Sequence, residues 1–380
     1  MIENPNLIKK NNLEPEKINL DSDKDIIVDK EEVIEIGKIK PEREKSPEKN
    51  QIRIEKITPE VSVIMAVHND EKYVEEAIKS ILDQIFRNFE LIVIDDYSTD
   101  NSLKILEEYA SRDPRIKIIR LSENIGPGGA RNEGLKAAKG RYIAVQDADD
   151  ISMPERLQKE YEYLVKNEDK FLVHSGAFYI NENDTKIIQE RIPIVNEKEL
   201  LETLKIKNVI VHPTVMYKNQ DYRYRPKLWF SEDYDLYLRL MSDGKKFGTT
   251  PELLVKYRVS ESSRSFNKIT TQRLAAIKAN EYYYERLKTG NDSYDFLDEK
   301  EIINVNPLKN ENEAVIRALI TSYRILEDNK NLRFFCKRYF TLFGFFNKYL
   351  FVFFISYLPK NFVNFVKSKI PTKIKELFSN

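Results

Sequence analysis

The chain has 380 residues, which is long enough for one large domain or two ordinary ones. Hydrophobic residues make up 41% of it, enough for a packed core, and the 33% charged share indicates solvated segments outside that core. Lys plus Arg and Asp plus Glu both number 62, so the net charge favours no charged partner and we expect no nucleic-acid ligand.

Cysteine and histidine limit the metal and redox chemistry of the chain. The single cysteine, Cys336, excludes an internal disulfide and a thiolate metal cluster. The histidines His68, His174 and His212 are too scattered to indicate a zinc site. No apolar segment near the start has the form of a signal peptide, so a reducing, cytosolic setting is the default expectation.

Residues 1–58 are expected to form a disordered charged tail. They contain no Phe, Tyr or Trp, and they include the stretch "KPEREKSPEKN". Such a segment buries too little apolar surface to offset its chain entropy. A short strand within residues 25–36 is the alternative.

Strands and helices alternate from Val61 onward. The predicted strands are 61–67, 89–95, 115–121 and 141–147, and the predicted helices between them are 71–84, 100–111 and 128–138. Continuous apolar strands that alternate with helices predict an α/β fold, with a mostly parallel sheet flanked by helices on both faces. We expect this domain to span residues 59–265.

The pattern becomes less regular after the fourth strand. A helix is predicted to begin with Ser152 as its cap, and another near Asp233. Further strands are predicted at 171–180, 186–191, 213–217 and 252–259. Residues 266–330 are expected to form a helical extension with helices at 267–288 and 312–328, followed by a helix at 332–358.

Polar residues follow three of the predicted strands, at 68–70, 95–100 and 147–150. Ligands bind beyond the carboxyl ends of parallel strands, so these ends mark a candidate site. Asp147 and Asp149 flank one alanine, and two carboxylates this close repel unless a cation is present. Oxygen ligands of this kind suit Mg²⁺ or Mn²⁺. An Asp-rich turn before a helix is the alternative.

Two other segments carry candidate functional side chains. The glycine-rich segment 124–134 is compatible with phosphate binding or with a tight loop, and Arg131 within it suits a phosphate or a carboxylate partner. Glu232 and Asp233 start a helix, where they serve either as a general base with its neighbour or as complements to the helix dipole. His212 either orients a site or is an ordinary strand-end histidine, and the second interpretation is favoured.

Residues 61–258 resemble the family 2 glycosyltransferases of the GT-A fold. The matching pieces, in order, are "VSVIMAVHND", "SILDQIFRNFELIVIDDYSTDNS", "ENIGPGGARNEGLKAAKGRYIAVQDADDISMPERL", "HPTVMY" and "SEDYDLYLRL". Each piece is weak alone, but the series is specific because its order and spacing match. The processive synthases' Q-x-x-R-W motif is absent, so the resemblance implies transfer of a single sugar.

The resemblance implies a role for each matching residue. The nucleotide-sugar pocket is expected to comprise Ala66, Val67, His68, Asp95, Asp96, Arg131, Asp147 and Asp149. Asp149, with Asp147, is expected to ligate Mn²⁺ or Mg²⁺. Asp233 is the expected catalytic base, supported by Glu232. The family often has a further metal-site histidine where this chain has Ser260, which is a departure from the pattern.

The resulting expectation is a metal-dependent, inverting glycosyltransferase of cell-surface glycan synthesis. Its donor is expected to be a nucleoside-diphosphate sugar, with UDP as the favoured nucleotide, and its acceptor a saccharide or a lipid-linked saccharide. The metal would neutralise the leaving diphosphate while Asp233 takes the acceptor proton. A sugar nucleotidyltransferase and an inactive, membrane-bound scaffold are the alternatives.

Residues 331–380 are dense in Phe and Tyr, and their cations greatly outnumber their one acid, Glu376. The apolar run 349–358 is shorter than the ~20 residues that span a bilayer. Basic residues interleaved with aromatics are typical of a helix on an anionic membrane surface, so this tail predicts peripheral binding at the inner face of the cell membrane. A buried helix or a dimer contact is the alternative.

Overall fold

The computed structural model describes residues 58–259, 269–298, 316, 320 and 329–343. The expected N-terminal tail, most of the predicted helix 312–328 and the second half of the predicted helix 332–358 lie outside the described residues.

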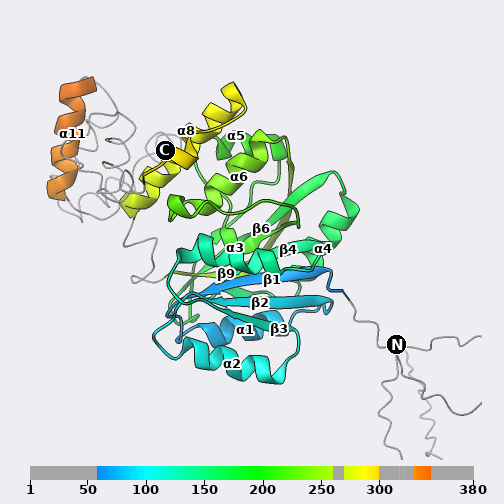
Figure 1. The fold of residues 1–380 in the computed structure, drawn as a ribbon. Helices are drawn as coiled ribbons and strands as arrows, with labels where there is room; N and C mark the ends of the chain where they lie inside the picture. Colours follow the sequence, from blue (N-terminus) through cyan, green and yellow to red (C-terminus); the bar gives the residue numbers. More distant parts are fainter. Residues whose placement is uncertain (1–57, 260–268, 299–315, 317–319, 321–328, 344–380) are drawn as a thin grey trace, which may run out of the picture. The chain divides into compact units, whose positions relative to one another are not determined.

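Strands and helices alternate regularly through the first half of the described chain (Figure 1). The elements are β1 (Val61–Val67), α1 (Val74–Leu82), β2 (Phe89–Asp95), α2 (Ser102–Arg112), β3 (Ile116–Arg120), α3 (Gly126–Ala137), β4 (Tyr142–Asp147), β5 (Ile151–Ser152), α4 (Arg156–Lys166), β6 (Lys170–Asn181), β7 (Ile187–Arg191), α5 (Glu197–Leu204), β8 (Val215–Lys218), α6 (Glu232–Ser242), β9 (Lys246–Val259), α8 (Ile269–Thr289) and α11 (Asn329–Phe343). Short 3₁₀ turns occur at His212–Thr214, Pro226–Leu228 and Tyr294–Phe296.

The strands of the described chain form one nine-stranded sheet in the order β3-β2-β1-β4-β8-β6-β9-β5, with β7 beside β6. β1 pairs in parallel with β2 and β4, β2 with β3, and β6 with β9. The pairs β4–β8, β6–β8, β6–β7 and β5–β9 are antiparallel. The α/β class is confirmed, but the sheet is mixed rather than mostly parallel. Parallel neighbours need a crossover connection, and the regular strand–helix alternation ends after α4.

The residues of β1 alternate between two apolar clusters, one on each face of the sheet. Val61, Val63 and Met65 pack with residues of α1, α2 and α4. Ile64, pointing the opposite way, packs with Ala130 of α3. Figure 1 shows α1 and α2 on the opposite side of these strands from α3. Burial on both faces explains why the strand is a continuous apolar run.

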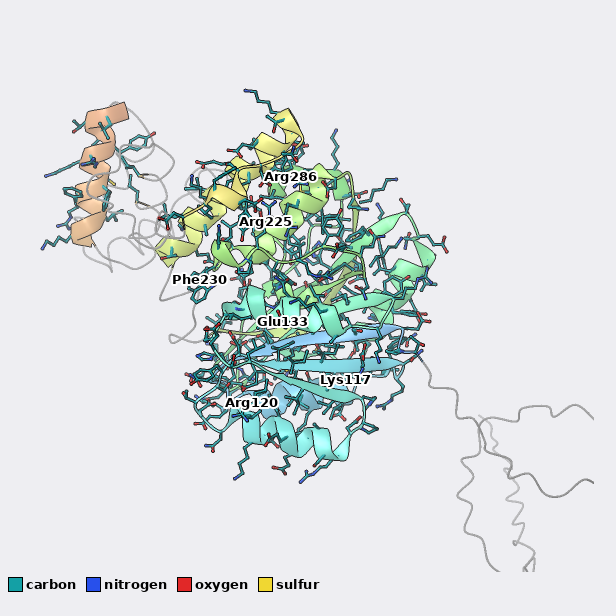
Figure 2. The ribbon with its side chains drawn as sticks, viewed as in Figure 1. Lys117, Arg120, Glu133, Arg225, Phe230 and Arg286 are labelled. Atoms are coloured by element: carbon teal, nitrogen blue, oxygen red, sulfur yellow. The ribbon has the colours of Figure 1, made fainter. Side chains whose placement is uncertain are left out.

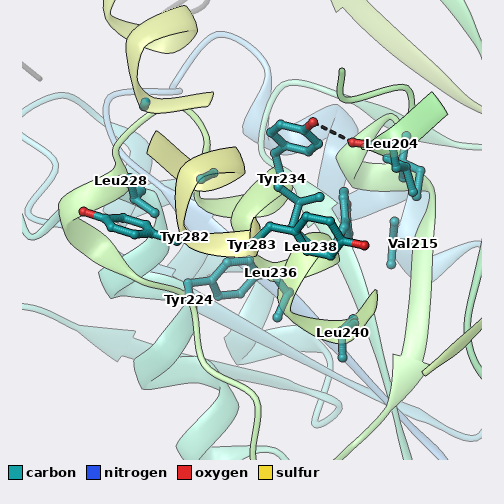
Figure 3. Packing of buried hydrophobic residues seen from close by; sticks show 14 of the residues in the cluster. Leu204, Val215, Tyr224, Leu228, Tyr234, Leu236, Leu238, Leu240, Tyr282 and Tyr283 are labelled. Carbon is teal, nitrogen blue, oxygen red and sulfur yellow. Dashed lines mark hydrogen bonds between the residues drawn. The ribbon is translucent and has the colours of Figure 1, made fainter. Parts of the chain in front are cut away.

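The cluster containing α3 extends to α6 and α8. Leu236 and Leu240 of α6 are buried in it, as are Tyr282 and Tyr283 of α8 (Figure 3). The hydroxyl of Tyr234 donates a hydrogen bond of 2.6 Å to the backbone oxygen of Leu204, at the end of α5. The first part of the predicted extension therefore packs on the helix that carries Glu232 and Asp233.

The start of α4 differs from the prediction. This helix begins at Arg156, because Ile151 and Ser152 instead form β5, which pairs with β9. The Ser152 hydroxyl donates to Oε1 of Gln146 at 2.6 Å and caps no helix. The sequence showed the capping pattern, but the competing strand pairing involves residues about a hundred positions away.

α11 has one buried face, formed by Leu332, Phe335, Cys336 and Tyr339. Their spacing is that of a single helical stripe. Phe334 and Leu342 of the same helix are exposed. Within the described part of the chain, no helix is both long and apolar enough to cross a bilayer.

Candidate active site

A pocket of about 540 Å³ opens where β1 and β4 end and α3 and α6 begin. This volume lies in the range of small-molecule binding sites. The residues that line it are Ala66, His68, Asp70, Asn124, Gly126, Pro127, Arg131, Asp147, Ala148, Asp149, Tyr179, Arg191, Asn208, Val209, Ile210, Val211, His212, Pro213, Trp229, Phe230, Glu232, Asp233, Tyr257, Arg258 and Gln272.

Most of the predicted site residues meet at this pocket. Those that line it are Ala66, His68, Arg131, Asp147, Asp149, Glu232 and Asp233. Val67, Asp95 and Asp96 do not line it, and all three are buried. The structure thus brings together residues from four separate segments of the sequence.

Asp95 and Asp96 hold the backbone beside the pocket. Oδ1 of Asp95 accepts a hydrogen bond of 3.3 Å from the backbone amide of Ser98. Oδ1 of Asp96 accepts one of 2.8 Å from the amide of Ile125, which precedes α3. The Nδ1 atom of His68 lies 2.7 Å from the backbone oxygen of Asp96. These contacts fix the loops at the ends of β1 and β2, and nucleotide contact by the two aspartates stays a prediction.

Arg131 joins the two acidic sides of the pocket. Its Nη2 donates to Oδ1 of Asp147 at 2.7 Å, and its Nη1 donates to Oε1 of Glu232 at 3.2 Å. Burial acts to lower the pKa of this guanidinium, but the charges of Asp147 and Glu232 outweigh it and raise the pKa above its usual value. Of the two partners predicted for Arg131, the structure shows carboxylates.

Asp233 lies in the first turn of α6, half-buried at the pocket wall. Its Oδ2 accepts a hydrogen bond of 2.9 Å from Nδ2 of Asn208. Burial, followed by the neighbouring charge of Glu232, raises the pKa of Asp233 to about 7. A carboxylate with this pKa is suited to accept a proton near neutral pH. Asn208 was not predicted, since no motif marks the residue.

Arg258 of β9 holds the turn that carries Asp147 and Asp149, which we call the D-x-D turn. Oδ1 of Asp150 accepts a hydrogen bond of 2.7 Å from the backbone amide of Arg258, and Nε of Arg258 donates to the backbone oxygen of Asp149 at 2.8 Å. Burial, together with the charges of Asp149 and Asp147, raises the pKa of Asp150 well above its usual range. A bound cation would reduce the repulsion between the carboxylates at this turn.

The residues at this turn fit a divalent cation that a substrate helps to hold. Among the described residues, no group of three His, Cys, Asp or Glu side chains is arranged to bind a metal alone. Asp147 and Asp149 do both line the pocket. Mg²⁺-type ions commonly bind through one or two carboxylates and complete their shell with water and substrate phosphates. Ser260, where the family often has a metal-site histidine, lies outside the described residues.

His212 is buried between two tyrosine hydroxyls. Its Nδ1 lies 2.7 Å from the hydroxyl of Tyr237, and its Nε2 lies 3.1 Å from that of Tyr224. Burial, followed by the charge of Arg131, lowers the pKa of His212 to about 3, so the ring is neutral. It lies in a 3₁₀ turn rather than at a strand end, and both ring nitrogens have a polar neighbour.

An aromatic pair beside the acids was also not predicted. Trp229 and Phe230, which precede α6 in the chain, both line the pocket. Phe230 is labelled in Figure 2. Gly126, the first residue of α3, has φ +76°, and a Cβ there would lie 2.6 Å from the Trp229 ring. Phe230 has φ +70°, a conformation that side-chain-bearing residues seldom adopt. The chain's only tryptophan next to an acidic helix start was the available signal.

Comparison with known proteins identifies the family. The model of "Glycosyl transferase family 2" matches residues 62–224. An uncharacterized glycosyltransferase of Methanocaldococcus jannaschii is 35% identical over 236 residues, which cover 61% of this chain and 79% of that one. This chain belongs to the family 2 glycosyltransferases. Family membership confirms both the resemblance and the GT-A fold class, and it supports a transferase over the nucleotidyltransferase alternative.

Other similar proteins include two transferases of Escherichia coli and one solved structure. The Escherichia coli O-antigen biosynthesis glycosyltransferase WbnJ is 35% identical, over 60% of this chain and 91% of that protein. The E. coli UDP-Glc:alpha-D-GlcNAc-diphosphoundecaprenol beta-1,3-glucosyltransferase WfaP is 34% identical, over 55% and 80%. The S. aureus TarS 1–349 structure in complex with UDP aligns with a TM-score of 0.47 at 20% identity, covering 74% of this chain and 86% of that one.

Proposed function

We propose that this glycosyltransferase moves a single sugar, with inversion, from a UDP-sugar to a saccharide acceptor carried on a lipid, in cell-surface glycan synthesis. The observation that carries the proposal is the Asp233 carboxylate at the wall of a pocket that Asp147 and Asp149 also line. A base with a pKa of about 7 thus shares one pocket with a carboxylate pair suited to a metal-bound diphosphate.

The chemistry follows from the residues that line this pocket. A divalent cation held by Asp149 with Asp147 would supply Lewis-acid neutralisation of the leaving diphosphate. The Asp233 carboxylate accepts the proton of the acceptor hydroxyl, and the acceptor oxygen forms a bond to the anomeric carbon as the bond to diphosphate breaks. Asn208 orients the Asp233 carboxylate through its amide. One displacement from the opposite face inverts the anomeric configuration, so no covalent nucleophile is required.

Relatives support the donor and acceptor classes in this proposal. WfaP is named for a UDP-sugar donor and for an acceptor on diphosphoundecaprenol, and it covers 55% of this chain at 34% identity. WbnJ is named for O-antigen biosynthesis. We extend both classes to this protein, with peripheral binding to the inner face of the cell membrane through residues 331–380 as part of the proposal.

Two substitutions of pocket residues test the proposal. Donor binding would be followed by thermal shift with a panel of nucleotide sugars and Mn²⁺, and transfer by product formation with a lipid-diphosphate saccharide. Asp149→Asn should lose metal-dependent donor binding. Asp233→Asn should keep donor binding and lose about 10²- to 10⁴-fold in transfer, the usual contribution of a general base. Product NMR should show the inverted anomer.

Asp169→Asn is the matched control, because this exposed carboxylate pairs with Lys246 at the opposite end of β6 from the pocket. It should change neither measurement. Near-normal transfer by Asp233→Asn at saturating acceptor would refute the base assignment. Absence of donor binding and of donor hydrolysis in the wild-type protein would instead favour the scaffold alternative.

A further inference from the structure

Arg191, at the end of β7, differs from the other arginines of the pocket. Arg131 is paired with Asp147 and Glu232, and Arg258 is paired with Glu76 at 2.7 Å. Within the described chain, no carboxylate lies within ion-pair distance of Arg191, although its side chain lines the same pocket. A guanidinium with free donors in a concave site is suited to bind an anionic group of a ligand.

Two tyrosines lie beside Arg191 in the sheet. Tyr179 of β6 is opposite Tyr257 of β9, with ring centroids 5.0 Å apart, and Arg191 is paired with Ala177, two residues before Tyr179. Neither tyrosine hydroxyl has a hydrogen-bond partner among the described residues. Burial raises the pKa of both phenols, so both stay protonated at neutral pH and can donate. Arg191 and these hydroxyls form a group of available donors.

The chain on either side of Arg191 carries exposed aliphatic side chains. We call Ile187, Ile188, Ile192 and Val195 the β7 aliphatic strip; their exposed fractions are 52%, 55%, 63% and 57%. Single exposed apolar residues are ordinary, but four within nine positions form a surface that usually contacts a partner or ligand. β7 is also an edge strand, paired only with β6, where exposed apolar residues favour aggregation unless covered.

We propose that Arg191, Tyr179 and Tyr257 bind the phosphate of an amphiphilic acceptor, and that the β7 aliphatic strip receives its hydrocarbon chain. The inference rests on the proposed transferase function and assigns its acceptor subsite. The acids Asp147, Asp149, Glu232 and Asp233 line the same pocket, so an anionic acceptor needs cationic and neutral donors there to offset their repulsion. Ile192 directly follows Arg191 in the chain, so the strip begins next to the guanidinium and gives the hydrocarbon chain a path out of the pocket.

The test uses the chain's only tryptophan, Trp229, which lines the pocket, as a fluorescent reporter of binding. The donor site is first saturated with Mn²⁺ and the nucleoside diphosphate that stabilises the protein most in thermal shift. The probes are decyl diphosphate below its micelle concentration, inorganic diphosphate, and the neutral amphiphile decyl maltoside. We expect decyl diphosphate to bind more tightly than either of the other two.

Arg191→Gln should weaken decyl diphosphate binding by about tenfold or more, because a charge-assisted contact is lost. The affinity of Arg191→Lys for decyl diphosphate should fall between those of the wild type and Arg191→Gln, since lysine keeps the charge but loses the bidentate geometry of the guanidinium. Lys186→Gln is the charge-matched control on the same hairpin and lines no part of the pocket. Ile188→Ser with Ile192→Ser should weaken decyl diphosphate but not inorganic diphosphate, whereas Ile85→Ser, an exposed isoleucine preceding β2, should weaken neither.

Two outcomes would overturn the inference. The phosphate assignment fails if Arg191→Gln and Lys186→Gln bind decyl diphosphate alike. The hydrocarbon assignment fails if the two serine substitutions leave its affinity unchanged, or if they instead convert a dimer to a monomer on size exclusion. Donor hydrolysis is measured on every variant. If hydrolysis persists while these contrasts vanish, the subsite is wrong and the transferase function stands. If the wild type neither binds nor hydrolyses the donor, the transferase proposal itself fails.

Discussion

Arg131 determines which acids of the pocket are paired with a cation. Its guanidinium contacts Asp147 at the end of β4 and Glu232 at the start of α6, although Arg131 and Glu232 are 101 residues apart. Asp233 is next to Glu232 but hydrogen-bonds to Asn208. Two adjacent acids therefore have different environments: Glu232 is paired with a cation, whereas Asp233, the proposed proton acceptor, has a raised pKa.

This difference predicts the pH dependence of transfer. The base must be ionised, so kcat/KM should rise with pH and level off above an apparent pKa of about 7. The charge of Glu232 is the second cause of the raised pKa, after burial. Removing a like charge favours the ionised form, so Glu232→Gln should move the rising limb to lower pH. The measurement is kcat/KM between pH 5 and 9 at saturating Mn²⁺.

Glu133→Gln is the control for that experiment, because this carboxylate pairs with Lys136 on the exposed side of α3. It should leave the profile where it is in the wild type. A rising limb in Glu232→Gln that stays in place, or moves to higher pH, would contradict the electrostatic assignment. Unchanged melting temperatures would show that the shift does not come from unfolding.

At the scale of elements, the pocket depends on how α6 is held. Oδ2 of Asp235 accepts from Nε of Arg239 at 2.9 Å, one turn further along the helix. Nη1 of Arg225, which precedes α6, lies 2.8 Å from Oδ2 of Asp292, which follows α8. Figure 2 shows Arg225 beside α6 and Arg286 on α8. Nη1 of Arg225 also lies 3.6 Å from Oδ1 of Asp235. Arg225 thus links the segment after α8 to the helix that carries the proposed base, which gives residues 269–298 a role in positioning Asp233.

The start of α3 gives the element-scale prediction. Gly126→Ala should destabilise the protein and displace Trp229, since the added Cβ would lie 2.6 Å from its ring. A positive φ costs a non-glycine residue about 1–2 kcal/mol, and the overpacking adds about 1–3 kcal/mol. We expect a lower melting temperature, a shifted tryptophan emission maximum and weaker donor binding.

Gly290→Ala separates the two effects. Gly290 has φ +80°, close to that of Gly126, but nothing lies within 4 Å of the position of its Cβ. It should therefore show the conformational cost alone, with tryptophan emission unchanged. If both variants lose the same stability and neither shifts the emission, Trp229 is not held against α3 as the structure has it.

At the scale of the whole molecule, the candidate site and the predicted membrane contact lie in different parts of the chain. The residues that line the pocket end at Gln272, whereas the cationic tail begins at residue 331. α11, at the start of that tail, has a buried face, so these apolar side chains are already covered by protein. The membrane prediction therefore rests on residues 344–380, which lie outside the described residues.

Deleting residues 344–380 should release the protein from anionic vesicles and leave donor hydrolysis intact. This segment has six lysines and one acid, and each cation near an anionic surface contributes about 1 kcal/mol. Binding of the full chain should weaken at high salt, because salt screens that attraction. Co-sedimentation with neutral and anionic vesicles measures both effects. Equal binding by the full and truncated chains would exclude the tail as the contact, and aggregation after truncation would support the buried-helix alternative.

The sequence by itself determined the parallel half of the sheet and most of the pocket. Continuous apolar strands, helices between them and polar strand ends are local patterns, so they placed Asp147, Asp149 and Asp233 without knowledge of the fold. The family resemblance came from the same local segments, and family membership confirms it.

Only the tertiary structure decided the pairings between distant segments. The mixed sheet, β5 in place of a helix start, and the positions of Asn208, Trp229 and Arg191 in the pocket all depend on residues far apart in sequence. Such contacts leave no periodic or capping pattern in the sequence, because the fold, and not the spacing along the chain, determines which side chains meet. For the same physical reason the sequence left a phosphate and a carboxylate as possible partners of Arg131. The structure shows that its guanidinium contacts carboxylates.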